Sequence, residues 1–216
     1  MVKGRILAHR GFWIKPEEKN SKGALLRALN SGYGIETDVR DLNGDLVISH
    51  DPPTVEALSF EWLLDQYVQT NSVGVLALNI KSDGLAKQLN NMLADRSIVS
   101  AFVFDMSVPD TLSYLSLETA VFCRMSEYEP TAAFDTPGVW LDNFSGEFDQ
   151  LGSAAKLFEQ KKAVAFVSPE LHKRPHREFW QKLKPHVLEH NERVLICTDF
   201  PDQAEEYFGG GVGVSG

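Results

Sequence analysis

The sequence predicts an α/β protein, a closed (β/α)8 barrel of the TIM type that carries a short β-hairpin near its N-terminus. Three observations predict this fold. Short apolar runs alternate with amphipathic helical patterns from one end of the 216-residue chain to the other. Eight such runs occur, and eight strand–helix units favour a closed barrel, whereas five or six would favour an open sheet. Polar or charged residues follow the runs, as expected where barrel strands end at an active rim.

The predicted elements alternate in order along the chain. Strands are predicted at residues 5–8, 34–38, 75–80, 101–104, 119–123, 139–141, 163–167 and 193–197, and helices at 21–32, 59–68, 84–96, 154–162 and 177–190. Two sets of leucines recur at the spacing of one buried helix face, namely Leu25, Leu26 and Leu29, and Leu85, Leu89 and Leu93. Asn43-Gly44 stands between extended segments and is a strong signal for a two-residue hairpin turn.

Composition and length limit the class of protein. We expect one barrel domain over residues 1–208 and a flexible Gly-rich tail over 209–216, whose GVGVSG ending is followed by no helix and predicts no nucleotide site. A formal charge of −9 argues against nucleic-acid binding. No apolar run suits a signal peptide or membrane insertion, so we expect a cytoplasmic protein, without a prediction of oligomeric state. Cys123 and Cys197 stand singly in apolar segments and predict buried free thiols.

Ionisable and polar residues gather where the predicted strands end. They are His9-Arg10, Glu36 with Asp38, His50-Asp51 after the hairpin, Asn79 with Lys81, Asp105, Arg124 with Glu127, Asp142, Ser168 with Glu170, and Thr198-Asp199. A barrel needs apolar layers inside rather than a ring of ionisable groups at one rim. This concentration therefore predicts a functional site at the carboxyl ends of the strands.

Glu36 and Asp38 are the first candidates for a metal site. They are two residues apart on a predicted strand, so both side chains point to the same face. Adjacent carboxylates repel each other, and a hard divalent cation such as Mg²⁺ or Ca²⁺ relieves that repulsion because it prefers oxygen ligands. Ion pairs with Arg10, Arg40 or Lys81 would relieve it equally well, and the spacing leaves both interpretations open.

His9 and His50 are candidates for proton transfer. Each closes an apolar run and precedes a charged residue, and at neutral pH one imidazole can accept a proton while the other donates one. The guanidinium of Arg10 suits a phosphate, and Asp51 could orient His50. With a metal to stabilise charge on a phosphoryl oxygen, this set suits cleavage of a phosphodiester.

These motifs resemble the opening signature of the glycerophosphodiester phosphodiesterase family, within the superfamily of PLC-like phosphodiesterases. The resembling segments are AHRGFW, PEEKNSKGALLRAL, GIETDVRDLNGDLVISHD, LALNIKSDGLAKQL and CTDFPDQAEEYF, in the family's order. The resemblance implies a (β/α)8 phosphodiesterase barrel with a role in lipid metabolism. It implies His9 and His50 as the acid–base pair, Arg10 and Lys81 as phosphate contacts, and Glu36, Asp38 and Asn79 as ligands of Mg²⁺ or Ca²⁺.

Three departures from the family pattern affect the prediction. The third metal carboxylate of the family falls on Asn79, which predicts a weaker site, completed by water or by Glu170. The PEN[ST] segment is lengthened to PEEKNS, a change expected in a surface loop. The chain after Asp51 is short where relatives carry an insertion, so other loops must form the head-group pocket. Candidates for that pocket are Arg124, Glu127, Trp140 and Asp142.

The sequence therefore predicts a metal-dependent phosphodiester hydrolase. Its substrate would be a small glycerophosphodiester-like molecule, cleaved to an alcohol and a phosphomonoester such as glycerol phosphate. Two alternatives stay open: a non-catalytic protein that binds a phosphate ligand on a decayed site, and a phospholipase-like lyase that forms a cyclic phosphate. A further pattern, HVLEH at residues 186–190, fits a zinc motif, but its helix precedes the last strand and belongs to the outer ring.

Overall fold

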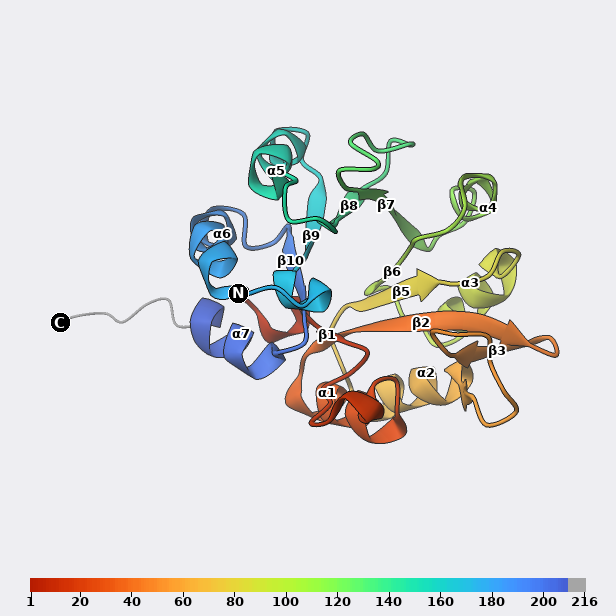
Figure 1. Ribbon diagram of the computed structural model, residues 1–216. Coiled ribbons are helices and arrows are strands. Elements are labelled where there is room, and N and C mark those ends of the chain that lie inside the picture. The colour runs from red at the N-terminus through yellow and green to blue at the C-terminus, as the bar shows by residue number, and fades with distance from the viewer. Residues whose placement is uncertain (210–216) are drawn as a thin grey trace.

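The computed structural model describes residues 1–209, whose ten strands form one sheet that closes on itself (Figure 1). Eight strands are parallel and form the barrel, because β1 pairs with β10 on one side and with β2 on the other. The predicted fold is confirmed, and every predicted strand overlaps an observed one. Around the barrel the order is β1 (Ile6–His9), β2 (Gly34–Leu42), β5 (Leu76–Ile80), β6 (Ala101–Phe104), β7 (Ala120–Met125), β8 (Gly138–Leu141), β9 (Ala163–Val167) and β10 (Val194–Thr198).

The remaining two strands lie outside the barrel. β3 (Asp45–Ile48) pairs antiparallel with the far half of β2, and the short β4 (Leu58–Ser59) pairs with β3. Asn43 and Gly44 join β2 to β3, and both have left-handed backbone angles, with φ of 54° and 95°. The predicted hairpin is therefore confirmed, because this turn needs two residues that tolerate positive φ.

Seven α-helices are described within residues 1–209, and they surround the barrel (Figure 1). They are α1 (Lys22–Ser31), α2 (Phe60–Gln69), α3 (Ala86–Ala94), α4 (Val108–Tyr114), α5 (Gln150–Glu159), α6 (Arg177–Glu189) and α7 (Pro201–Gly209). No helix was predicted at α4 or α7, although each has a proline in its first turn, a common start of a helix. The β7–β8 connection corrects the expectation of eight helices: residues 126–137 contain Pro130 and Pro137 and form no helix.

Two apolar layers position the site. The larger one lies between the helices and the outer face of the strands, and it includes the predicted leucines Leu25, Leu29, Leu85, Leu89 and Leu93. Leu26, predicted on the same helix face, is only partly buried and lies outside this layer. The smaller one fills the barrel interior, where Phe102 stacks on Phe122 and Phe104 stacks on Trp140, with centroids 3.9 Å apart in both pairs. This aromatic layer belongs to a packed core and not to a channel, so polar chemistry is confined to the rim.

The cysteines and the C-terminal end of the chain can also be compared with their predictions. Cys123 and Cys197 are buried and free, as predicted. Gly209, the first residue of the predicted tail, is the last residue of α7, and residues 210–216 lie outside the described part of the chain. Within residues 1–209, none of the helices combines the length and apolar character needed to cross a bilayer.

Candidate active site

His9 is the last residue of β1, and its imidazole is held by a carboxylate from the last strand. Its Nδ1 lies 2.6 Å from Oδ1 of Asp199, which directly follows β10, the neighbour of β1. Lys19 lies 3.3 Å from the same carboxylate oxygen. Burial lowers the pKa of His9, and this effect outweighs the hydrogen bond and charge of Asp199, which raise it. His9 is therefore neutral at neutral pH and able to accept a proton.

The turn after β1 directs Arg10 into the barrel mouth. Arg10 has a left-handed φ of 57°, and its backbone N–H donates to the carbonyl of Glu36 on the neighbouring strand at 2.8 Å. Gly11 continues the turn with φ of 89°, and a Cβ there would lie 2.7 Å from the backbone carbon of Ala24. Glycine is thus required at this position, which explains why an apolar strand ends in the segment His-Arg-Gly.

Glu36 and Asp38 lie side by side on β2, as predicted from their spacing. Both are buried, and the register places Asp38 beside Asn79 on β5. Glu36 Oε2 lies 3.9 Å from Nε2 of His9, and the amide of Asn79 donates to Glu36 Oε1 at 3.4 Å. Glu36 is therefore between the first histidine and the residue that replaces the family's third carboxylate.

Asp38 receives most of the nearby positive charge. Arg10 Nε lies 3.1 Å from its Oδ2, and Lys81 Nζ lies 3.5 Å from its Oδ1. The side-chain amide of Asn20 donates to Oδ2 at 2.9 Å, while the hydroxyl of Thr37 fixes the other end of that amide. Two of the three basic partners considered for this carboxylate pair are thus present. Arg40 differs, because it donates to the carbonyl of His50.

Glu36 shows the electrostatic cost of this arrangement. Burial and the charge of Asp38 raise the pKa of Glu36 to about 8, and they outweigh Arg10 and Lys81, which lower it. The positive charges of Arg10 and Lys81 are therefore not enough to keep both Glu36 and Asp38 ionised at neutral pH. A further cation beside Glu36 would favour its ionised form.

The oxygen atoms of this set fit a hard divalent ion. Buried Asp38 Oδ1 and Asn79 Oδ1 accept no hydrogen bond from any described residue, although Lys81 Nζ lies 3.5 Å from Asp38 Oδ1. Both oxygens therefore have room for a further ligand contact. With Glu36 they offer two carboxylates and one amide carbonyl, the ligand types of Mg²⁺ and Ca²⁺. Across residues 1–209, no three His, Cys, Asp or Glu side chains form a metal-holding group. The set around Glu36 contains two carboxylates and the Asn79 amide, so a metal ion bound there would have an amide among its ligands.

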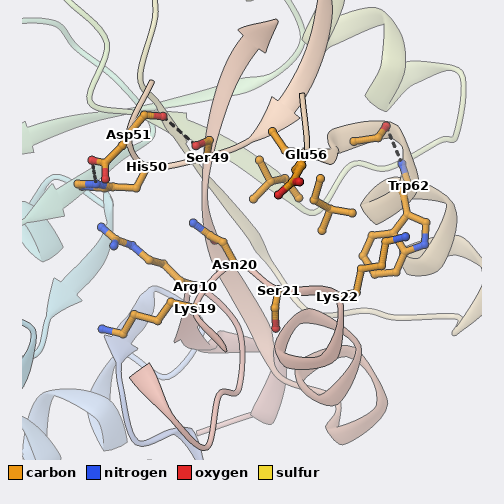
Figure 2. A pocket seen from close by; sticks show the side chains of 14 residues that line it. Arg10, Lys19, Asn20, Ser21, Lys22, Ser49, His50, Asp51, Glu56 and Trp62 are labelled. Atoms are coloured by element: carbon orange, nitrogen blue, oxygen red, sulfur yellow. Dashed lines mark hydrogen bonds and ion pairs between the residues drawn. The ribbon is translucent and has the colours of Figure 1, made fainter. Parts of the chain in front are cut away.

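His50 follows the hairpin and lies apart from the buried set. Its side chain is 47% exposed, and its Nδ1 lies 2.9 Å from the carboxylate of Asp51. No hydrogen bond or ion pair joins His50 to His9 among the described residues. Both His50 and Arg10 line an open groove of about 840 Å³ that runs between the loop after β3 and the start of α1 (Figure 2). His50 thus faces the same opening as the guanidinium of Arg10.

The opposite part of the rim is linked by closed ion pairs. Arg124 contacts Asp105 at 2.8 Å and also Glu129, while His172 Nε2 lies 2.7 Å from Asp142. Asp105 is also 3.8 Å from Lys81, so it connects the two parts of the rim. Arg124 and Asp142, two of the residues predicted to bind the head group, are therefore already paired with other side chains of the protein.

The other predicted rim residues also have structural partners. Trp140 is buried in the barrel interior, and Glu127 accepts from the backbone N–H groups of Phe144 and Ser145. Glu170 accepts from the hydroxyls of Ser168 and Thr198 and from the N–H of Asp199. Both carboxylate oxygens of Glu170 are therefore engaged, and nothing in the described residues places Glu170 among the oxygens around Glu36.

Two site residues were missed by sequence reasoning. Asp199 was noted only as a strand end, although the pairing of β1 with β10 brings it to His9. Asn20, in the lengthened PEEKNS segment, was assigned to a surface loop, but its amide contacts Asp38. The signal for Asp199 was the closure of the barrel, because the first and last strands of such a barrel are neighbours.

Comparison with known proteins supports this fold. A crystal structure of a glycerophosphodiester phosphodiesterase from Agrobacterium tumefaciens matches 96% of this chain and 99% of its own, with 16% identity and a TM-score of 0.67. A phosphodiesterase from Oleispira antarctica, in complex with the product sn-glycerol-3-phosphate, matches 95% of this chain and 97% of its own, with 14% identity and a TM-score of 0.66.

A less similar crystal structure, that of a phospholipase, also matches this fold. A Ca²⁺-dependent phosphatidylinositol-specific phospholipase C from Streptomyces antibioticus matches 96% of this chain and 98% of its own, with 10% identity and a TM-score of 0.58. No protein-family model and no curated protein sequence matches the chain. The barrel is thus of the type found in glycerophosphodiester phosphodiesterases and this phospholipase, and the predicted resemblance is confirmed for the fold.

Proposed function

We propose that the protein is a phosphodiesterase that hydrolyses small glycerophosphodiesters with the aid of a divalent metal ion. One observation carries this proposal. The neutral imidazole of His9, oriented by a carboxylate, lies 3.9 Å from the buried acid Glu36. Arg10, which follows His9 in the chain, directs its guanidinium into the same barrel mouth. Proton transfer, charge stabilisation and phosphate binding are thereby available within one site.

His9 is suited to act as the general base. Asp199 holds the Nδ1 side of the ring at 2.6 Å, which directs Nε2 toward Glu36 and the barrel mouth. A neutral imidazole in this tautomer can take a proton from an attacking hydroxyl at Nε2. Asp199 would then stabilise the imidazolium, in the way that a buried carboxylate supports histidine in other hydrolases.

Arg10 and Lys81 are suited to hold the phosphate. Both contact Asp38, and both side chains keep about one fifth of their surface exposed, 23% and 20%. A guanidinium and an ammonium on one side of the mouth can bind the non-bridging oxygens of a phosphodiester. Asp38 limits the mobility of both cations, so they are already in place when the substrate binds.

Glu36, Asp38 and Asn79 would hold the metal ion, for which Mg²⁺ and Ca²⁺ are the candidates. A bound ion would supply stabilisation of the negative charge that develops on the phosphoryl oxygens. The same ion would oppose the raised pKa of Glu36 by favouring its ionised form. The neighbour from Streptomyces antibioticus, described as Ca²⁺-dependent, supports a requirement of this kind.

His50 is suited to protonate the leaving alcohol. It is exposed, it pairs with Asp51, and its carbonyl is fixed by two hydrogen bonds from Arg40, so the backbone of this loop is held at the groove. A general acid must be reachable by the leaving group, and the exposed ring of His50 meets this requirement better than the buried ring of His9.

A non-catalytic phosphate-binding role is the second candidate, and one observation favours it. The third carboxylate of the family pattern is an amide here, Asn79, and it donates to Glu36. A site with fewer negative charges binds a divalent ion more weakly. Such a protein would keep Arg10 and Lys81 as phosphate contacts and lose turnover.

One assay separates these functions. Purified protein is incubated with a panel of glycerophosphodiesters, in EDTA and then with Mg²⁺ or Ca²⁺, and phosphorus NMR identifies the products. The proposal predicts a phosphomonoester that appears only with metal. Accumulation of a cyclic phosphate would indicate a lyase. Absence of turnover with every diester and both metals, together with phosphate binding, would contradict the proposal in favour of a binding protein.

A further inference from the structure

Glu170 follows β9, and its carboxylate is buried without a close cation. Its side chain is 7% exposed, and its one ion-pair partner among the described residues is His176, whose Nδ1 lies 3.8 Å from Oε2. Burial lowers the pKa of His176, so this ring is neutral at neutral pH. The hydrogen-bond donors to Glu170 are all neutral groups. A buried charge that has only neutral donors is costly, so a structural role alone would favour a neutral side chain here.

The donors to one oxygen of Glu170 come from the end of β10. Thr198 is the last residue of β10, and the regular pairing of β1 with β10 ends where Ala8 meets Thr198. The backbone of Asp199 therefore lies beyond this ladder. Its N–H donates to Glu170 Oε1 at 3.2 Å, and the Thr198 hydroxyl donates to the same oxygen. Glu170 thus fixes the main chain of the residue whose carboxylate orients His9.

The other oxygen of Glu170 is anchored in the protein core. The hydroxyl of Ser168 donates to Oε2, and the indole N–H of Trp180 on α6 donates to Ser168 Oγ at 2.8 Å. Neither Ser168 nor Trp180 has any exposed surface. Hydrogen bonds therefore run from α6 through Glu170 to the main chain of Asp199, whose carboxylate lies 2.6 Å from His9 Nδ1. Support of this kind keeps the partner of a reacting group in a fixed geometry.

A second link between strand ends shows that a charge is not needed to join them. The amide of Gln150 donates to the carbonyls of Leu141 and Val167, the last residues of β8 and β9, at 2.9 Å and 3.3 Å. Gln150 is 3% exposed, so the two links are similarly buried. Hydrogen bonds to a charged acceptor are roughly twice as strong as those between neutral groups. The carboxylate therefore occurs at the link that also holds Asp199.

We propose that Glu170 is a positioning residue, which keeps Asp199, and through it His9, in the geometry that proton transfer needs. This inference rests on the proposed phosphodiesterase function, since it assigns His9 the role of base. Glu170 contacts neither substrate nor metal in this proposal. Its loss should therefore lower kcat, leave KM nearly unchanged, and have an effect only while Asp199 keeps its carboxylate.

A double-mutant cycle tests this dependence. Glu170→Ala should lower kcat about tenfold in the wild-type background and less than about twofold in the Asp199→Asn background, because residues that act as one unit are not additive. Glu170→Gln keeps an acceptor of the same shape and should restore kcat to within about threefold of wild type. Glu170→Asp, which retracts the carboxylate from Asp199, replaces alanine in the cycle if the alanine variant does not fold.

Proton NMR gives a readout that does not depend on turnover. The proton shared by His9 Nδ1 and Asp199 lies in a short hydrogen bond and should resonate far downfield in wild type and in Glu170→Gln. Glu170→Ala should move this resonance upfield or abolish it.

Gln150→Ala is the matched control, since it removes a similarly buried link between strand ends on the opposite rim. It should lower the stability to urea as Glu170→Ala does, yet keep kcat within about twofold of wild type and leave the resonance unchanged. An equal loss of kcat from Glu170→Ala in both backgrounds, or an unchanged kcat and resonance, would overturn this inference and leave the phosphodiesterase function intact. Absence of turnover in wild type would instead remove the proposed function. The resonance would then still decide whether Glu170 positions Asp199 and His9.

Discussion

Two His–Asp pairs lie at the mouth of the barrel, and in isolation they are nearly the same. His9 lies 2.6 Å from Asp199, and His172 lies 2.7 Å from Asp142. Their surroundings differ. The second ring nitrogen of His9 faces Glu36, and nearby buried oxygens of Asp38 and Asn79 accept no hydrogen bond from the described residues. The ring of His172 packs instead against Phe144, with centroids 5.1 Å apart.

A histidine oriented by a carboxylate is therefore not in itself evidence of a catalytic group. Near His9, Asp38 Oδ1 and Asn79 Oδ1 accept no hydrogen bond from the described residues, and the pKa of Glu36 is raised to about 8. The basic residues present therefore do not compensate fully for the two carboxylates. Near His172, Asp142 accepts from both His172 and the N–H of Asn143. We therefore expect a ligand to bind in the first region, whereas the partners of His172 and Asp142 suit a structural role.

Replacing His9 with glutamine is expected to have the largest effect on activity, and replacing His172 with glutamine is its comparison. His9→Gln should reduce kcat at least about 100-fold, because general acid–base catalysis contributes about 10²–10⁴-fold. His172→Gln should change the rate about twofold or less, as for most substitutions outside a site. Steady-state hydrolysis of a glycerophosphodiester measures both. An equal loss in the two variants would show that the two pairs do not differ in the way proposed.

Asp199→Asn should have the next largest effect, a loss of about 10- to 100-fold in kcat, since the variant no longer orients the imidazole. It should also change the pH dependence. His9 must be neutral to act as a base, so activity falls as pH drops through its pKa. Asp199 raises that pKa, hence its removal should move the acid limb to lower pH. A pH–rate profile checks the direction, and an acid limb that moves to higher pH would contradict the role of Asp199. Asp142→Asn serves as the control.

Asn79→Glu should strengthen the metal site. A third carboxylate restores the charge of the family pattern, and we expect affinity for Ca²⁺ or Mg²⁺ to rise at least about tenfold. Calorimetric titration of wild type and variant measures this change directly. If the variant binds no more tightly, residue 79 is not a ligand. Asn143→Glu on the opposite rim is the matched control and should leave the affinity unchanged.

Arg124→Gln tests the structural part of the rim and should have the smallest effect. It breaks the pairs with Asp105 and Glu129, and partly exposed ion pairs contribute about 1 kcal/mol or less each. We expect the free energy of unfolding in urea to fall by about 1 kcal/mol and activity to stay within about twofold of wild type. A large loss of activity with normal stability would place Arg124 in the site.

The sequence was a good guide wherever local pattern decides structure. The apolar runs, the Asn43-Gly44 turn and the Glu36–Asp38 pair depend on neighbours in the chain, and each lies where expected. The resemblance in the His-Arg, Glu-x-Asp and His-Asp segments led to the right fold. Two prolines in residues 126–137 were the available sign that one connection has no helix.

What the sequence could not give depends on pairing across long distances. Asp199 reaches His9 because the barrel closes, and Asn20 reaches Asp38 because the turn after β1 returns over the mouth. Trp140 was a candidate for the head-group pocket, but strand pairing turns it into the interior. At the strand ends, residues of the same chemical type differ in role according to the partners that surround them, and those partners come from distant parts of the chain.

A crystal structure of the protein soaked with Ca²⁺ and glycerol phosphate would show whether the barrel mouth binds both the ion and the phosphate. We expect an ion within about 2.3–2.6 Å of oxygens from Glu36, Asp38 and Asn79, and a phosphate in contact with Arg10 and Lys81. The proposed metal site would be contradicted by a phosphate bound at the mouth with no ion, while Asp38 stays paired with Arg10 and Lys81 at saturating Ca²⁺.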